Sequence, residues 1–300
     1  MNPQSDHDRT AAITGAGGGL GRDIAIGLAK KGYRVFGTAR RGDEVAELEE
    51  ATNGAALLTL ADITKEGDVG AWTQEVTAAV GDGGLDVLVN NAGILTPGPL
   101  ELLPIDAVRH EFEVNVFASL AVINALLPAL RRAHGRIVQI GSMTGRLPLP
   151  FNGPSSASKA ALEAFADVYR GELKPFGVAF VMVQPGNMAT GGPAKTAAAL
   201  KTAADSMTAE QRELYGTTFA EFSDAMNSMQ GSGLSSSAAA AKVIEAVEQQ
   251  PAPIRVPVGP DAEEILGLVH EQTDEELDEL RMRLVGLSGD AATGPARVTR

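Results

Sequence analysis

Apolar residues along this chain gather in short, nearly continuous runs, and longer segments with helical periodicity separate them. The runs that predict strands lie at residues 10–14, 33–39, 56–60, 86–89, 136–140, 178–183 and 254–256. Strands without alternation between apolar and polar positions are typical of sheets that are buried on both faces. The segments between them have the length of helices, so the pattern predicts βαβ units around a parallel sheet.

Helices are expected from the end of a glycine-rich loop to about residue 31, and over 43–51, 65–80, 105–132, 156–173 and 236–249. Asp43 is expected to cap the second of them. Two capping boxes, Thr208 to Gln211 and Thr273 to Glu276, predict two later helix starts. Right-handed crossovers place such helices on both faces of the sheet. The predicted fold class is therefore α/β, a doubly wound parallel sheet.

The chain is expected to form a single domain over residues 1–285, because no linker divides it before residue 190. The Ala-, Thr- and Met-rich segment at about 191–233 interrupts the βα pattern and is interpreted as a helical substrate lid. The alternative is a helical hairpin on the surface. Residues 286–300 are small and polar and are expected to be a disordered tail.

Composition excludes several functions. The formal net charge of −13 disfavours nucleic acid and anionic membranes as partners, and the absence of cysteine excludes disulfides and thiolate sites. Residues 1–9 are polar, and the apolar stretch 118–130 is interrupted and too short to span a bilayer, so no membrane partner is expected. The four histidines lack ligand spacing, so no metal site is expected. A cytoplasmic location is expected.

The segment Thr14 to Gly21 joins the first predicted strand to the first helix. Its spacing is T-G-x-x-x-G-x-G, through Gly15, Gly19 and Gly21. Glycines let backbone amides at a helix N-terminus approach a pyrophosphate. The loop therefore predicts a dinucleotide site of the Rossmann type, formed by Gly15, Gly17, Gly18, Gly19, Leu20 and Gly21.

The end of the second predicted strand indicates which dinucleotide is bound. A carboxylate at this point would bind the ribose 2′-hydroxyl of NAD, but the sequence places Arg40 and Arg41 there. A guanidinium suits a 2′-phosphate by charge and by geometry. We therefore expect Arg40, with Arg41 assisting, to select NADP(H); the alternative is two solvated surface arginines.

Further polar and glycine positions follow at regular intervals along the same half of the chain. They are Asp62 and Ile63 after the third strand, Asn91, Ala92 and Gly93 after the fourth, Asn115 in the long helix, Ser142 after the fifth strand, Lys159 in the next helix, and Pro185, Gly186 and Thr190 after the sixth strand. With the glycine loop, these residues make the chain resemble the short-chain dehydrogenase/reductase family from about residue 10 to residue 190. The lid region and Tyr215-Gly216 resemble its hydroxysteroid and retinol dehydrogenase-like branch.

The resemblance implies roles for these residues. Asp62 and Ile63 would lie beside the adenine, Asn91 to Gly93 would contact the cofactor, and Pro185, Gly186 and Thr190 would lie near the nicotinamide carboxamide. Asn115 would hold a water of a proton relay, Ser142 would orient a substrate carbonyl, and Lys159 would lower the pKa of a tyrosine four residues before it. The implied reaction interconverts a secondary alcohol and a ketone with NADP(H).

That tyrosine is absent, because Ser155 occupies its position four residues before Lys159. Serine is a weaker acid and is shorter by a whole ring, so Ser155 cannot reach the place of the phenol oxygen. Three interpretations follow: a water held by Ser155 and Lys159 fills the gap and some activity remains; the chain is a catalytically silent NADP(H)-binding protein; or the chain is an inactivated variant of an active dehydrogenase.

The loops expected around the nicotinamide carry apolar side chains, which favours an apolar alcohol or ketone as substrate. These residues are Leu95, Met143, Leu147, Leu149, Phe151 and Met188. Helices of this family pair across a two-fold axis, so the resemblance implies a homodimer or homotetramer.

Overall fold

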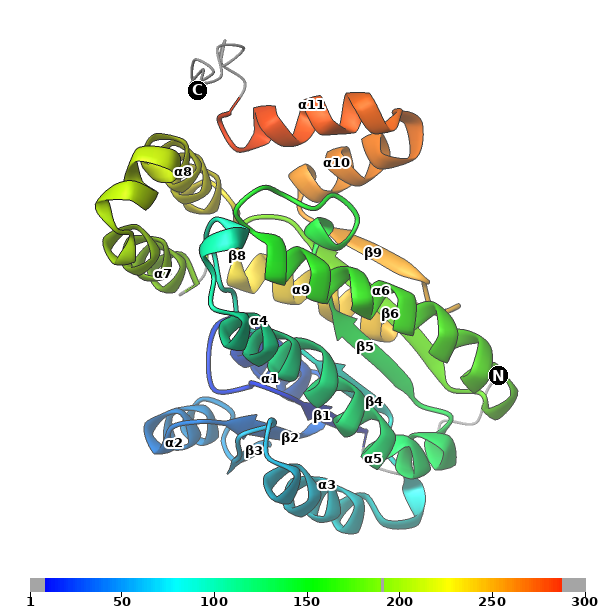
Figure 1. Ribbon diagram of the computed structural model, residues 1–300. Coiled ribbons are helices and arrows are strands. Elements are labelled where there is room, and N and C mark those ends of the chain that lie inside the picture. The colour runs from blue at the N-terminus through cyan, green and yellow to red at the C-terminus, as the bar shows by residue number, and fades with distance from the viewer. Residues whose placement is uncertain (1–8, 190–191, 288–300) are drawn as a thin grey trace, which may run out of the picture.

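The computed structural model describes residues 9–189 and 192–287, with the side chains of residues 192 and 193 left undescribed. Its centre is a seven-stranded sheet in the order β3-β2-β1-β4-β5-β6-β9, and every neighbouring pair is parallel (Figure 1). The strands are β1 (Thr10–Ile13), β2 (Arg34–Ala39), β3 (Ala56–Leu60), β4 (Val87–Asn90), β5 (Arg136–Ile140), β6 (Ala179–Pro185) and β9 (Arg255–Val258). The doubly wound α/β fold is confirmed. Its order reverses between β1 and β4, where ligands of such sheets bind.

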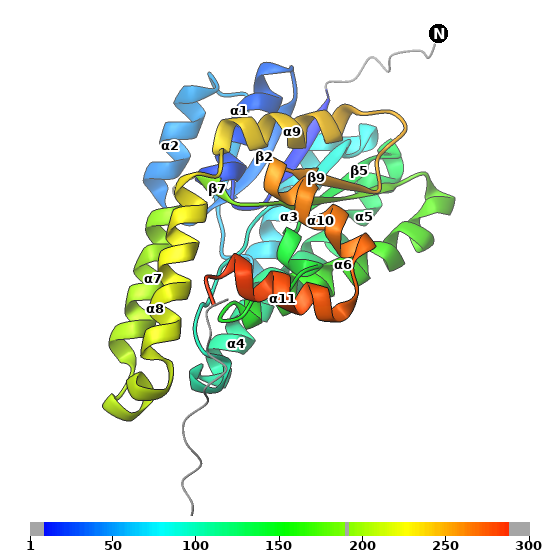
Figure 2. The same ribbon diagram turned by 90° about the horizontal axis from the view of Figure 1, so that it is seen from above.

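Each central strand sends alternate side chains into two different cores. In β1, Ala11 and Ile13 join a cluster with α1 (Gly19–Lys30), α2 (Gly42–Ala51) and α9 (Ser236–Glu248), whereas Ala12 faces the other side. The other core packs α3 (Glu66–Val80), α5 (Ala118–Ala133) and α6 (Gly153–Leu173) on the sheet. Burial on both faces therefore explains the unbroken apolar runs of the strands (Figures 1 and 2).

Two helical pairs lie outside these layers. Helices α7 (Gly192–Ser206) and α8 (Ala209–Gly231) stand side by side at one edge of the molecule, and β7 (Met188–Ala189) and β8 (Leu234–Ser235) pair at their base. Helices α10 (Pro260–Glu271) and α11 (Asp274–Leu284) form the second pair (Figure 1). Both predicted capping boxes are present, at the starts of α8 and α11.

Phe151, Phe219 and Phe222 form the core under α7 and α8, with ring centroids of Phe151 and Phe222 5.3 Å apart. Val285, just after α11, is fully buried in the same cluster. The predicted lid is thus a helical hairpin whose inner face packs on the loop after β5 and on the residues that follow α11.

The structure corrects three local predictions. Asp43 does not cap α2, because the helix already begins at Gly42 with Arg41 as its N-cap residue. Helix α6 begins at Gly153, three residues earlier than expected, with Pro154 in its first turn. The predicted helix 105–132 contains a π-helical turn, Glu113–Phe117, between α4 (Ile105–Phe112) and α5.

The stretch Ile105–Ala133 is long and apolar enough to cross a membrane by length and composition alone. However, 61% of its most apolar window is buried inside the fold. Val122, Leu126 and Leu130 pack in the core of the sheet, which accounts for the hydropathy of this stretch.

Candidate active site

A cavity of about 490 Å³ opens where the sheet order reverses, between the glycine loop and the loop after β4. Its volume falls in the range typical of cofactor and ligand sites. Many predicted cofactor residues line it together: Gly15, Gly17, Gly18, Gly19, Leu20, Arg40, Asp62, Ile63, Asn91, Ala92 and Gly93. The fold therefore brings residues from four separate βα loops to one surface.

The glycine loop presents the open N-terminus of α1 to this cavity. Gly18 is the N-cap residue, no side chain caps the helix, and no acidic residue lies in its first turn. A side-chain Cβ placed on Gly18 or Gly19 would meet no atom within 4 Å. Uncapped amides and the positive end of the helix dipole thus face open space, which suits a pyrophosphate.

Contacts within the loop fix its position against the sheet. The Gly15 amide donates to the Thr38 hydroxyl at 2.9 Å, and the Ala16 amide donates to the Thr38 carbonyl at 2.8 Å. The side chain of Asn91 donates to the carbonyls of Thr14 and Gly15 at 3.0 and 3.2 Å. Asn91 therefore joins the loop after β4 to the glycine loop.

The two arginines at the end of β2 have different surroundings. Arg41 pairs with Asp43 at 3.0 Å and with Glu44 at 3.5 Å, and it does not line the cavity. Arg40 lines the cavity and is exposed, and within residues 9–189 and 192–287 its guanidinium has no ion pair. Arg40 is therefore the cation at this end that can meet an anionic ligand.

Asp62 lines the cavity just after β3, the neighbour of β2 in the sheet. Its Oδ1 accepts hydrogen bonds from the Thr64 hydroxyl at 2.7 Å and from the Thr64 amide at 3.1 Å. These bonds hold the pKa of Asp62 below its usual range. Asp62 is thus a fixed, ionised acceptor at the end of the cavity near Arg40.

Lys159 is half-buried and lies beside Gly93, which lines the cavity. Its Nζ donates to the Ile140 carbonyl at 3.0 Å, and a Cβ on Gly93 would stand 3.6 Å from Nζ. A side chain at position 93 would therefore contact the ammonium, whereas glycine leaves this space free. Burial lowers the pKa of Lys159 to about 8, although the carboxylate of Glu111 acts in the opposite direction.

Asn115 lies in the π-helical turn and is 1% exposed. Its Oδ1 accepts from the Ile94 amide at 2.9 Å, and its Nδ2 donates to the Ile94 carbonyl at 3.1 Å and to Ser158 Oγ at 3.0 Å. Its backbone carbonyl accepts from Ser119 Oγ at 3.0 Å. Asn115 thus ties the loop after β4 to α6; such π-turns often occur at functional sites.

Ser142 and Ser155 come from two neighbouring elements. Ser142 Oγ accepts from the Thr144 amide at 3.1 Å and from the Thr144 hydroxyl at 3.0 Å. In the part of the chain that the structure describes, its own proton has no acceptor, so Ser142 can donate to a substrate oxygen. Ser155 lies in the first turn of α6 and is 8% exposed.

Some predicted residues lie away from the cavity wall. The segment Pro185-Gly186 ends β6, where Asp261 of α10 accepts from the Asn187 amide at 2.7 Å. Thr190 lies outside the described residues. Met143, Leu147 and Leu149 are buried in packing clusters with the C-terminal helices or the lid, so they are core residues rather than cavity walls.

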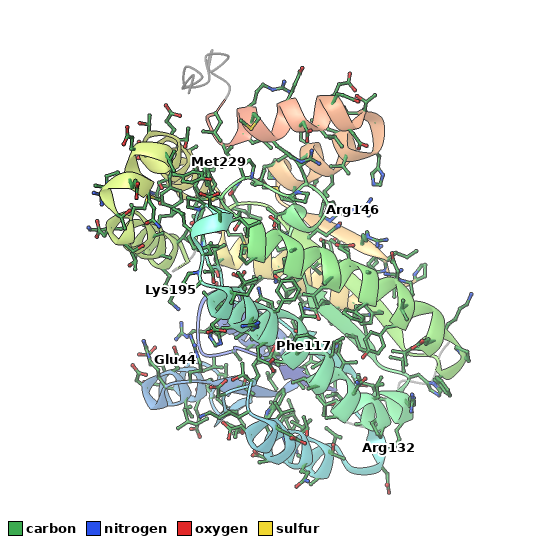
Figure 3. The ribbon with its side chains drawn as sticks, in the orientation of Figure 1. Glu44, Phe117, Arg132, Arg146, Lys195 and Met229 are labelled. Carbon is green, nitrogen blue, oxygen red and sulfur yellow. The ribbon has the colours of Figure 1, made fainter. Side chains whose placement is uncertain are left out.

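Several residues of this site were not predicted from the sequence. His110 and Val114 line the cavity from the helix before Asn115, Glu44 lines it from α2, and Lys195 lines it from α7. Figure 3 shows Lys195 and Glu44 on the same side of the molecule. Lys195 has no motif around it, and only the fold of the lid brings its cation to the cavity.

Comparisons with known proteins agree with this geometry. The family model described as short chain dehydrogenase matches residues 9–201. The NADPH-dependent 3-dehydrocapnine reductase of Ornithobacterium rhinotracheale is 34% identical over 84% of this chain and 88% of its own length. Retinol dehydrogenase 16 of Mus musculus is 35% identical over 71% of this chain and 68% of its own length.

A solved structure is also similar. The crystal structure of a short-chain dehydrogenase from Streptomyces avermitilis aligns with a TM-score of 0.73 at 28% identity, and it covers 93% of this chain and 96% of that one. The family match extends over the glycine loop, the residues after β4, and the Ser142 and Lys159 positions. The chain therefore belongs to the short-chain dehydrogenase family of oxidoreductases.

Proposed function

We propose that this chain is an NADP(H)-dependent oxidoreductase that interconverts a secondary alcohol and a ketone on an apolar substrate. One observation carries the proposal: a single cavity is lined by Arg40 after β2, by the uncapped N-terminus of α1 after β1, and by Gly93 after β4, in the order of these strands in the sheet, and Lys159 lies beside Gly93. An elongated ligand with a central pyrophosphate and a terminal phosphate fits this order of groups.

The residues present fit such a cofactor. The amides of Gly18 to Leu20 would hold the pyrophosphate, Arg40 the 2′-phosphate, and Asp62 and Ile63 the adenine side. The bound cofactor would supply hydride. Ser142, with its proton free, would donate to the substrate oxygen, and the Lys159 ammonium would stabilise negative charge that develops there.

Two measurements test this function. Binding of NADPH is followed by its fluorescence, and oxidation of NADPH by a panel of apolar ketones is followed by its absorbance. The proposal expects saturable binding and ketone-dependent oxidation. Binding without oxidation, both in this chain and in the Ser155→Tyr variant, would contradict it.

A second candidate function is a catalytically silent NADP(H)-binding protein. Ser155 favours this candidate, because the chain then has no phenol at the position where proton transfer is expected. The two candidates differ in turnover alone. Ketone-dependent NADPH oxidation by the unmodified chain would exclude the silent one.

Replacing Arg40 with alanine should lower the affinity for NADPH by about 10- to 100-fold and leave that for NADH nearly unchanged, because hydrogen bonds to charged groups contribute about 1.5–3 kcal/mol. Arg41→Ala is the matched control. Arg41 is paired with Asp43 and Glu44, so Arg41→Ala should change the ratio of NADPH affinity to NADH affinity much less than Arg40→Ala does. Fluorescence titration of both cofactors measures the ratio. An unchanged ratio in Arg40→Ala would rule out this role.

The family resemblance also leads us to propose a homo-oligomer built on the outer faces of α5 and α6. Phe117, directly before α5, and Phe165 and Val168 of α6 are 54%, 38% and 54% exposed, and Figure 3 labels Phe117. We expect Phe117→Asp to shift the chain toward monomer in sedimentation velocity, since it places a charge in an apolar contact. Leu214→Asp, on the exposed side of α8, is the control. A monomeric unmodified chain would disprove the proposal.

A further inference from the structure

A carboxyl group lies buried next to the position from which the tyrosine is missing. Glu111, in the last turn of α4, is 0% exposed. Its Oε2 accepts from the Thr96 amide at 2.8 Å, and its Oε1 accepts from Asn115 Nδ2 at 3.3 Å. Its carboxyl group also interacts with the Ser155 hydroxyl, and Lys159 is near enough to act on its charge. Glu111 therefore interacts with three of the predicted catalytic residues, Asn115, Ser155 and Lys159.

Ion pairing does not explain why this carboxyl is buried. Glu163 provides the comparison: it is 6% exposed, and Arg255 donates to it at 2.8 Å. For Glu111, by contrast, no cation within residues 9–189 and 192–287 reaches salt-bridge distance. Fully buried glutamates are rare without a partner. A buried carboxyl held by neutral donors beside a reaction site is a candidate for proton transfer.

We propose that Glu111 is a positioning residue that holds the transferred proton and exchanges it through the Ser155 hydroxyl. The proposal rests on the proposed function. In reduction, the carbonyl carbon accepts hydride, its π electron pair moves to the oxygen, and that oxygen takes a proton from a water molecule held between Ser155 and Lys159. The water oxygen takes the Ser155 proton. The Ser155 oxygen takes the Glu111 proton as the carboxyl O–H bond breaks. A carboxylate remains, and solvent reprotonates it by way of Lys159. Oxidation reverses each step.

The surroundings of Glu111 favour this use. Burial raises its pKa, and the hydrogen bonds from Thr96 and the charge of Lys159 only partly offset the effect. The carboxyl therefore keeps its proton to a higher pH than a solvated glutamate. The groups that face it are Lys159 and Ser155 from α6, Asn115 from the π-turn and the Thr96 amide from the loop after β4; His110, next to it on α4, lines the cavity.

These facts set the sign of the pH dependence. Reduction needs protonated Glu111, so its rate should fall as pH rises through the raised pKa. Oxidation needs the carboxylate, so its rate should rise over the same range. Lys159 loses its charge near pH 8, which removes an interaction that favours the carboxylate. The pH profile should therefore contain one limb from Glu111 and one from Lys159.

The test compares Glu111→Gln with Glu163→Gln, a change of the same chemistry at a buried glutamate outside the site. We expect Glu111→Gln to lower kcat for ketone reduction by about 10- to 100-fold, with little change in KM, and to remove the Glu111 limb of the pH profile. Glu111→Asp should restore part of that limb. Glu163→Gln should keep the profile and lower Tm, because it breaks the pair with Arg255.

Two further measurements separate this inference from the function on which it rests. NADPH titration confirms that each variant is folded and loaded. Infrared difference spectra of the unmodified chain against Glu111→Gln should contain the carbonyl band of a protonated acid that disappears with rising pH. An unchanged pH profile in Glu111→Gln, or turnover in Ser155→Tyr but none in the unmodified chain, would overturn the role of Glu111. Absence of turnover in all variants would instead refute the oxidoreductase function.

Discussion

Replacing Ser155 with tyrosine should raise the rate of ketone reduction by about 10²- to 10⁴-fold, the range that a positioned general acid contributes. Ser155 precedes Lys159 by one helical turn on α6, so a phenol at position 155 would lie on the same helix face as the Lys159 ammonium. A nearby cation favours the phenolate and lowers the pKa of the phenol. The gain should appear in kcat, measured by NADPH oxidation.

Ser155→Phe is the matched control, because it adds the ring without the hydroxyl. It should bind NADPH and give no gain in rate. Equal rates for the tyrosine and phenylalanine variants would mean that the effect comes from packing, and would remove the phenol argument. With tyrosine in place, Glu111→Gln should cost much less than it does in the unmodified chain, since the phenol then donates directly.

The second large effect is expected for Gly21→Val in the first turn of α1. A Cβ on Gly21 would fall within contact distance of the Gly15 carbonyl oxygen and of Asn91 Nδ2. Both are fixed parts of the cofactor loop, so the loop itself must move. Overpacking of this kind costs about 1–3 kcal/mol, and valine adds more bulk than the Cβ alone. We expect NADPH affinity to fall by at least about 10²-fold.

Gly70→Ala is the control for Gly21→Val. Gly70 lies in α3, where an added Cβ meets no atom within 4 Å. A helix gains about 0.5–1 kcal/mol when glycine becomes alanine, so this variant should raise Tm and keep the NADPH affinity. Wild-type affinity in Gly21→Val would show that the loop does not hold the cofactor as proposed.

The layered architecture could be predicted because it depends on local patterns. The apolar runs at 10–14 and 136–140 predict strands without knowledge of the strands they pair with. The glycine loop lies between the first of these runs and a helix. The capping boxes at Thr208 and Thr273 are also local, and both are present. The cofactor positions followed from the same order of motifs.

The rest of the site depends on how distant segments meet. Glu111 directly follows Arg109 and His110 and resembles a surface charge, yet it is fully buried beside the π-turn and α6. Lys195 reaches the cavity only through the placement of α7. Met143 and Leu147, which were expected near the nicotinamide, instead pack against α10 and α11, and no local pattern indicates this packing.

The sequence does not decide whether Asp43 caps α2 or pairs with Arg41. Aspartate is a good cap, but its carboxylate accepts from the Arg41 side chain at 3.0 Å and from the Glu44 amide at 3.0 Å. The helix begins at Gly42, and Arg41 pairs with this carboxylate and does not line the cavity.

Val285 gives the lid hairpin a tether to the far end of the chain. It fills the cluster under α7 and α8 together with Leu200, Phe219 and Phe222. If the hairpin moved away from the cavity, Val285 would either lose its apolar contacts with α7 and α8 or move with them, together with the end of α11. Residues just after α11 and the α7–α8 hairpin, which are far apart in sequence, therefore share one apolar core, so a displacement of either would disturb the packing of the other.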